Sequence, residues 1–152
     1  MSTSSTSTET VREGFALVLD PSVPLEEQVQ RGNYNYANPA ITQEHFSLTL
    51  SGGCEVVLFD PHGTVSSEEM VRRMKQDGYV PATLDDALAM GTQFPERQRQ
   101  NPIVFLGSVW RDGDGSRRVP VLFDWSGERG LGLGWFVYGW SVRCRFAAVR
   151  ES

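Results

Sequence analysis

The chain has 152 residues, of which 39% are hydrophobic and 22% charged, a composition typical of one ordinary globular domain. Its formal net charge of −5 argues against nucleic acid as the main partner, because neutralising phosphates requires a basic face. No apolar run approaches the length needed to cross a bilayer, and the amino terminus lacks the pattern of a secretion signal. We therefore expect a cytoplasmic protein without membrane insertion.

The first residues form a Ser/Thr tract, MSTSSTSTET, with too little apolar content to offset the entropy lost on ordering. Residues 1–12 are predicted to be a disordered tail, and residues 13–152 a single domain. FALVLD predicts the first strand, PLEEQVQ a short helix that ends at Gly32, and NYNYANPA a polar, aromatic loop. FSLTL and CEVVLFD are rich in β-branched and aromatic residues and predict two further strands.

Two longer helices are predicted next, each introduced by a capping box and closed by a glycine. The residues that mark their ends are Ser66, Glu69 and Gly78 for the first helix, and Thr83, Asp86 and Gly91 for the second. From Ile103 onward the sequence predicts strands at IVFLGSVW, RRVPVLFDW, RGLGLGW and CRFAAVRE, with RDGDGS as a hairpin tip. This order predicts an α+β fold with two short helices packed on antiparallel strands.

Few side chains are placed for catalysis or metal binding. The chain has only two histidines, His45 and His62, and His62 lies in a predicted turn where a solvated side chain is expected. RDGDGS resembles the opening of a calcium loop, but the closing glutamate is missing and a hairpin turn is favoured. Cys54 and Cys144 have no histidine beside them and are expected to be free thiols. We predict no catalytic residue, no metal site and no cofactor.

The segment LGWFVYGWSVRCRF, residues 133–146, crowds aromatic residues into a short stretch. Leu131, Leu133 and Trp135 alternate with glycines, which is the pattern of a strand packed on one face. The alternation ends at Phe136, because large residues then follow at both parities. Two interpretations stay open: a strand or hairpin whose aromatics complete the core, or an exposed aromatic and arginine surface typical of binding hot spots.

Four segments that span about Leu25 to Arg150 together resemble a widespread set of bacterial proteins: LEEQVQRGNYNYANPAITQEHF, SSEEMVRRMKQDGYVPATLDDALAMG, FPERQRQNPIVFLGSVW and WFVYGWSVRCRFAAVRES. The ending resembles the variable proteins of diversity-generating retroelements. This resemblance implies a C-type lectin-like fold whose last strands and loops present a ligand-binding face. It also implies diversification by an error-prone reverse transcriptase that substitutes at template adenines. Asparagine codons diversified in this way yield many residues, but not Trp, Lys, Met, Gln or Glu.

The resemblance assigns two sets of residues in this chain. The ligand-binding, variable positions are Phe136, Val137, Tyr138, Gly139, Ser141, Val142, Arg143 and Cys144. The framework that supports them is Trp110, Trp125, Trp135, Trp140 and Phe146. Gly132 and Gly134 are either further variable positions or ordinary sheet packing, with sheet packing favoured. The expected ligand is a protein or another macromolecule, and its identity and the oligomeric state are left open.

The sequence also departs from relatives of that fold. It lacks the Glu-Pro-Asn and Trp-Asn-Asp motifs of calcium-dependent sugar-binding lectins, so sugar binding is not carried over. The formylglycine-generating enzymes, which share the fold, depend on active-site cysteines, and an enzyme of that kind would require Cys54 to lie near Cys144. A third alternative is a structural or assembly protein that buries the aromatic segment in an interface. We predict a non-enzymatic binding protein.

Overall fold

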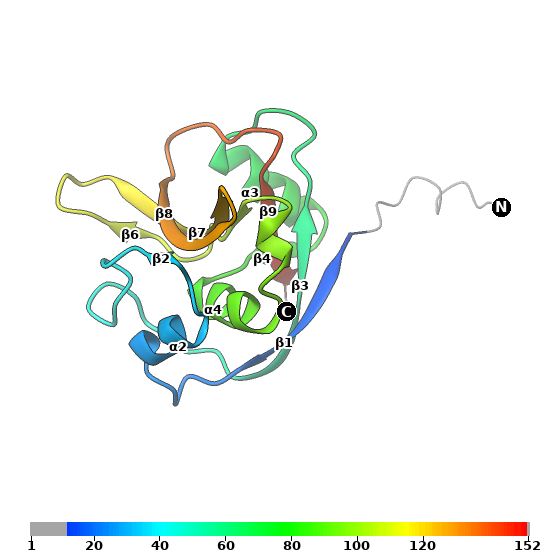
Figure 1. The fold of residues 1–152 in the computed structure, drawn as a ribbon. Helices are drawn as coiled ribbons and strands as arrows, with labels where there is room; N and C mark the ends of the chain where they lie inside the picture. Colours follow the sequence, from blue (N-terminus) through cyan, green and yellow to red (C-terminus); the bar gives the residue numbers. More distant parts are fainter. Residues whose placement is uncertain (1–11, 152) are drawn as a thin grey trace.

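The computed structural model describes residues 12–151, so the predicted disordered tail lies outside the described residues apart from Arg12. The described residues form three α-helices, one 3₁₀ turn and a single sheet of nine strands, which confirms the predicted α+β class (Figure 1). Within this part of the chain, no helix has both the length and the apolar character required to span a membrane.

The elements have the following bounds. The helices are α2 (Leu25–Arg31), α3 (Ser67–Gln76) and α4 (Leu84–Gln93), and the 3₁₀ turn is η1 (Arg97–Arg99). The strands are β1 (Gly14–Leu19), β2 (Tyr36–Ala37), β3 (Gly52–Phe59), β4 (Tyr79–Pro81), β5 (Ile103–Val104), β6 (Trp110–Arg111), β7 (Arg117–Trp125), β8 (Glu128–Trp135) and β9 (Arg145–Arg150).

The strand order is β1-β3-β9-β5-β7-β8-β2, with β4 paired to β9 and β6 paired to β7. Most pairs are antiparallel, but β5 runs parallel to β9, and β2 runs parallel to β8. The expectation of purely antiparallel strands is therefore wrong for these two pairs. Both involve two-residue strands that carry no periodicity of their own, and their direction is set by tertiary contacts rather than by local sequence.

Hydrophobic residues form a separate core on each face of the sheet. Successive residues of β9 alternate between the two cores: Phe146 and Ala148 belong to one, and Ala147 belongs to the other. Met70 and Met74 of α3 pack into the first core, whereas Leu25 and Leu88 bring α2 and α4 onto the second. We call these sides the α3 face and the α4 face, and Figure 1 shows α2 and α4 close together and α3 apart from them.

The capping signals located the helices well. The Ser66 hydroxyl accepts the Glu69 backbone N–H at 3.1 Å, and Gly78 follows α3 with a φ of +83°. The reciprocal half of that box is absent, because the Glu69 carboxylate binds Arg72 and Arg73 instead. At α4 both halves of the predicted box are present. The short helix α2 is capped by Gly32, as predicted.

The prediction that Gly91 ends the second helix is wrong. Helix α4 continues to Gln93, and the Phe94 N–H still bonds the Met90 carbonyl at 2.8 Å. A Cβ at Gly91 would overlap the hydroxyl of Tyr34, which packs directly against the helix backbone. The glycine therefore serves close packing rather than a helix end.

Two strand predictions also need correction. FSLTL is not a strand, because the Thr49 and Leu50 N–H groups donate to the Asp85 carboxylate at 2.9 and 3.0 Å instead of to a neighbouring strand. IVFLGSVW is broken into β5 and β6, and between them the Gly107 N–H bonds the Ala82 carbonyl at 2.9 Å. The predicted RDGDGS hairpin tip is confirmed, since it joins the antiparallel pair β6 and β7.

Candidate binding surface

The connection between β8 and β9, residues 136–144, is a loop rather than a strand or hairpin, and we call it the 136–144 loop. Its middle is fixed to the chain just before α3. The Trp140 N–H donates to the Val65 carbonyl at 2.8 Å, and the Val65 N–H donates back to the Trp140 carbonyl at 3.1 Å. These two bonds form an isolated antiparallel bridge between segments that are distant in sequence.

A buried serine ties the same part of the loop to the first turn of α3. The Ser67 hydroxyl donates to the Phe136 carbonyl at 2.7 Å and accepts the indole N–H of Trp140 at 2.8 Å. Ser67 is completely buried, and the Phe136 N–H is bonded to the Arg117 carbonyl at 2.9 Å. The polar groups at both ends of residues 136–140 are thus satisfied by partners outside the loop.

The second half of the loop is a tight turn. The Cys144 N–H bonds the Ser141 carbonyl at 3.1 Å, and the Arg143 N–H bonds the Ser141 hydroxyl at 3.2 Å. The Asn101 side-chain amide donates to the Arg143 carbonyl at 2.9 Å. The backbone is therefore held at Phe136, at Trp140 and in the turn that ends at Cys144, while several side chains are left free.

Six of the eight predicted variable positions are exposed. The side chains of Val137, Tyr138 and Val142 are 61%, 64% and 51% exposed, and the remaining three exposed positions are Gly139, Ser141 and Arg143. Phe136 and Cys144 are each only 8% exposed and belong to the core of the α3 face. The expectation that these two side chains present themselves to a ligand is wrong, because both pack inward at the ends of the loop.

The predicted framework residues divide between support and exposure. Phe146 is fully buried, and its ring meets the half-buried Trp140 ring edge-on with 6.0 Å between centroids. Trp135 is partly exposed and lies 6.0 Å from the Tyr138 ring. Trp110 packs against the core of the α4 face, on the other side of the sheet from Phe146.

Trp125 does not support the loop. It is 75% exposed beside the tight turn that joins β7 to β8. The two turn residues, Ser126 and Gly127, have φ values of +53° and +87°, as expected for a two-residue type I′ hairpin. The framework role assigned to Trp125 is therefore wrong, and its ring is available on the surface.

A shallow groove lies beside the loop, on the part of the sheet formed by β7 and β8. Its volume is about 400 Å³. The lining residues are Tyr36, Asn38, Arg118, Val121, Phe123, Gly132, Leu133, Gly134 and Trp140. We call it the glycine groove. Sequence reasoning did not identify Asn38 and Phe123 as site residues, because β2 and β8 meet only through long-range pairing.

Glycines form the floor of this groove because aromatic rings lie against them. In the β7–β8 ladder, Phe123 is opposite Gly130 and Val121 is opposite Gly132. A Cβ at Gly130 would overlap the Phe123 ring, and a Cβ at Gly134 would lie 2.7 Å from the Trp140 ring. These contacts favour sheet packing as the reason for the glycines in β8, the interpretation that the sequence also favoured.

Arg118 provides the charge at the groove. Its guanidinium lies 4.0 Å from the centre of the Trp135 ring and donates to the Leu133 carbonyl at 2.7 Å. The nearest carboxylate oxygen belongs to Asp112, 3.5 Å from Nη1, and the buried Nε has no acceptor. The cation is thus positioned by stacking and by the backbone, with donor capacity left over.

The remaining side chains with potential chemistry are scattered. Both cysteines are free, as expected, and Cys54 packs toward the α4 face whereas Cys144 lies in the core of the α3 face. Burial, together with the Asp86 carboxylate that accepts the thiol hydrogen, raises the pKa of Cys54 to about 12. His62 sits exposed in a turn. Among residues 12–151 no three His, Cys, Asp or Glu side chains are grouped to hold a metal ion.

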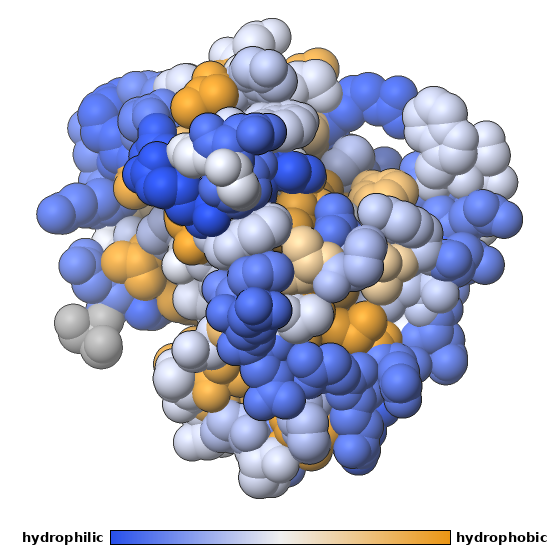
Figure 2. Space-filling model, turned by 90° about the vertical axis from the view of Figure 1, so that its left-hand side faces the viewer, coloured by the Kyte–Doolittle hydropathy of each residue, from blue (hydrophilic) through white to orange (hydrophobic). Residues whose placement is uncertain are grey.

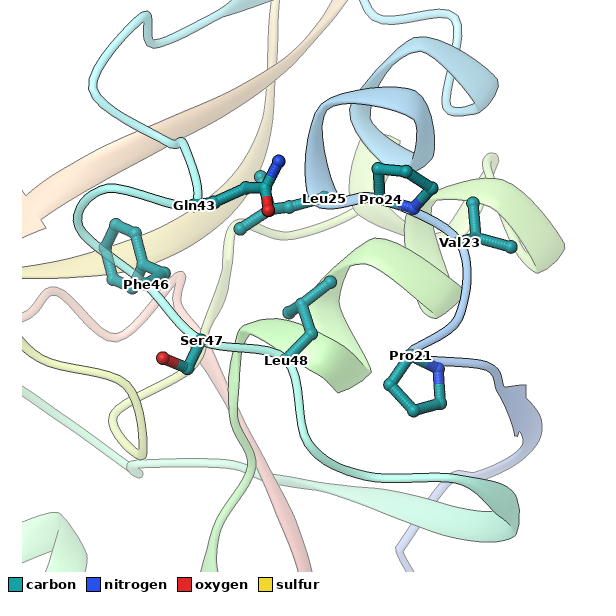
Figure 3. Close-up of a pocket in the computed structure, with 8 residues that line it drawn as sticks. All are labelled: Pro21, Val23, Pro24, Leu25, Gln43, Phe46, Ser47 and Leu48. Atoms are coloured by element: carbon teal, nitrogen blue, oxygen red, sulfur yellow. The ribbon is translucent and has the colours of Figure 1, made fainter.

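A second pocket, of about 250 Å³, lies between the segment after β1 and the segment before β3. Leu25 and Leu48 point into it from opposite sides, and none of the lining side chains is ionisable (Figure 3). Figure 2 shows the face that lies on the left-hand side of Figure 1, where hydrophobic residues gather in the middle between hydrophilic ones. The glycine groove and the 136–144 loop remain the place where exposed aromatic rings, a cation and a fixed backbone coincide.

No protein-family model, curated protein or solved structure matches the chain.

Proposed function

We propose that the protein is a non-enzymatic binding protein that recognises a protein ligand with the exposed side chains of the 136–144 loop. We further propose that it is a variable protein of a diversity-generating retroelement with a C-type lectin-like fold. In this proposal the ligand-contacting positions are the six exposed ones: Val137, Tyr138, Gly139, Ser141, Val142 and Arg143. Phe136 and Cys144 are anchors rather than contacts.

One observation carries the proposal: the backbone of the loop is fixed by groups that do not depend on the six exposed side chains, apart from the Ser141 hydroxyl. The bonds from Ser67, Val65 and Asn101 all involve loop backbone atoms or the Trp140 indole. A display surface requires this separation, because its supporting residues must keep their positions whichever side chains the surface carries.

The genetic code is consistent with this division into exposed contact residues and supporting residues. All six exposed positions hold residues that adenine substitution in asparagine codons produces, whereas Trp135 and Trp140 cannot arise in that way. Trp140 makes the loop-fixing bond to Ser67, as expected of an invariant support. The exposed set also contains tyrosine and arginine, which are enriched among residues that contribute most to protein interfaces.

The geometry gives little support to the alternative enzyme. A formylglycine-type mechanism requires two cooperating cysteines, but Cys54 and Cys144 belong to opposite faces of the sheet. A reactive thiol also requires a lowered pKa, and burial raises that of Cys54 to about 12. The assembly alternative fits less well, because three of the six exposed loop positions, Gly139, Ser141 and Arg143, carry no hydrophobic side chain.

A library experiment tests whether the loop is a display surface. Codons of the form NNY, which encode the residues reachable from asparagine codons, would replace all six exposed positions at once. Exposed substitutions usually change the free energy of unfolding by less than about 0.5 kcal/mol each, so six changes cost at most about 3 kcal/mol. Since domains are stable by about 5–15 kcal/mol, most library members are expected to fold.

The matched control library places the same codons at Phe136 and Cys144 only. Replacing these two buried side chains is expected to cost more than about 3 kcal/mol in most members, because it empties or overfills the core. Folding is scored by resistance to protease on the cell surface. If the six-position library folds no more often than the two-position library, the loop is not a tolerant display surface and the proposal fails.

A further inference from the structure

We propose that the glycine groove is a docking site for an aromatic side chain that a protein partner carries next to acidic residues. The proposal rests on the proposed function only in assigning the occupant to a protein ligand. It adds a second contact region, on β2, β7 and β8, whose residues are not among the variable positions. The groove would supply a constant anchor beside a varied loop.

The shape of the groove favours a flat ring. The backbone of Gly132 and Gly134 lines its floor, and the edges of the Phe123 and Trp140 rings lie against these two glycines. Its walls are the rings of Tyr36, Phe123 and Trp140. Aromatic pairs prefer offset or edge-on contacts at centroid distances of about 4.5–7 Å, and Tyr36 and Phe123 already form such a pair at 6.5 Å.

The size of the groove suits one anchor side chain. A volume of about 400 Å³ lies near the lower end of the range of about 300–1,000 Å³ that is usual for ligand sites. Anchors of this kind, inserted into pockets at an interface, contribute much of the affinity of protein complexes. The exposed Tyr138 and Val137 lie on the loop that also provides Trp140 to the groove, so one partner can contact both.

Two side chains at the groove, Asn38 and Arg118, offer N–H donors. The Asn38 Oδ1 atom accepts the Ala40 N–H at 2.9 Å, while within residues 12–151 its Nδ2 has no acceptor. Arg118 contributes a cation whose closest carboxylate contact is 3.5 Å long. No carboxylate lines the groove. An occupant that brings carboxylates therefore meets complementary groups, whereas a cationic occupant does not.

The local charge points the same way. Arg118 lines the groove, and Arg143 lies on the loop that provides Trp140 to it. Arg143 is exposed on the loop, and in the described part of the chain it has no carboxylate within salt-bridge distance. These two cations lie at or beside the groove although the chain has a formal net charge of −5, which favours an acidic partner there.

The test uses the full-length, ¹⁵N-labelled protein and three short peptides: acetyl-Glu-Trp-Glu-amide, acetyl-Lys-Trp-Lys-amide and acetyl-Glu-Leu-Glu-amide. The acidic tryptophan peptide is expected to shift the backbone amides of Gly132 and Gly134 and the indole N–H of Trp140. It should bind at least about tenfold more tightly than either of the other peptides, because only it matches both ring and charge. An oligothymidylate of ten nucleotides serves as a further probe.

Variants locate the charge dependence. Arg118→Gln is expected to reduce the preference for the acidic over the basic tryptophan peptide to less than about threefold, whereas Arg111→Gln on the neighbouring strand should leave it unchanged. Arg118→Lys keeps the charge and should retain most of the preference, which separates charge from folding effects.

The inference is overturned if the acidic tryptophan peptide fails to shift the groove resonances, if the basic peptide binds as tightly, or if the oligothymidylate binds more tightly. These outcomes do not depend on whether the loop is diversified, because the peptides test the groove alone. Failure of the loop library with success of the peptides would therefore refute the proposed function without refuting this site.

Discussion

Replacing Ser67 with alanine tests the claim that the 136–144 loop is held from outside. The completely buried hydroxyl makes two bonds, of 2.7 Å to the Phe136 carbonyl and 2.8 Å from the Trp140 indole. Its removal leaves one buried acceptor and one half-buried donor without partners, at about 1–3 kcal/mol for each unsatisfied group. Because water can reach the half-buried indole, we expect the free energy of unfolding to fall by about 2–4 kcal/mol.

The neighbouring residue supplies a matched control. Ser66→Ala removes the helix cap on the Glu69 N–H, which costs about 1 kcal/mol, but leaves the loop bonds intact. Guanidinium unfolding gives the two free energies, and amide hydrogen exchange reports the protection of residues 136–144. Only the Ser67 variant should show faster exchange in the loop. Equal destabilisation by the two variants, together with unchanged loop exchange, would show that Ser67 does not hold the loop.

Three further perturbations address the surface, the groove and the thiols. Tyr138→Ala should leave the midpoint of thermal unfolding nearly unchanged, whereas Phe136→Ala should lower the free energy of unfolding by about 3–5 kcal/mol. Equal effects would contradict the assignment of Tyr138 to the surface and Phe136 to the core. Gly134→Ala should cost about 1–3 kcal/mol because its Cβ meets an indole ring, while Gly113→Ala, with open space around its Cβ, should change stability by less than about 0.5 kcal/mol in the same denaturation assay. In a variant that lacks the other cysteine, Cys54 should react with iodoacetamide at pH 8 about 10³-fold more slowly than free cysteine, because a pKa of about 12 leaves little thiolate. The labelling rate should rise tenfold per pH unit up to about pH 10. Rapid labelling at pH 8 would argue against a buried thiol that is hydrogen-bonded to the Asp86 carboxylate.

Sequence patterns correctly predicted those elements whose structure depends on residues nearby in the sequence. Ser66, Thr83 and Gly78 act within a few residues of the helix ends they mark, so capping rules predicted α3 and the start of α4. The same logic predicted the β7–β8 strands and the hairpin tip before β7. These elements need no knowledge of the rest of the fold.

The elements that were predicted wrongly depend on contacts between residues that are distant in the sequence. Gly91 looked like a helix end until Tyr34, from a distant loop, proved to require the space. FSLTL has strand composition, but the Asp85 carboxylate satisfies its backbone instead. Neither contact leaves a periodic trace in the sequence, so neither could be predicted from local pattern.

The candidate site shows the same division. The sequence indicated the aromatic segment, and the resemblance implied eight variable positions, of which six are exposed. It could not show that Phe136 and Cys144 turn inward or that Trp125 turns outward, since these directions depend on α3 and on the β7–β8 turn. The glycine groove was missed because its walls come from three separate strands and the loop.

The most direct test of the central claim is to sequence the DNA around the gene and search for a second copy of the segment that encodes Leu131 to Arg150. We expect a near-copy beside a reverse transcriptase gene, differing almost only at adenines, with the differences at the codons for the exposed loop positions. The absence of any such copy would contradict diversification. Differences concentrated instead at the codons for Phe136, Trp140 and Cys144 would contradict the assignment of the support residues.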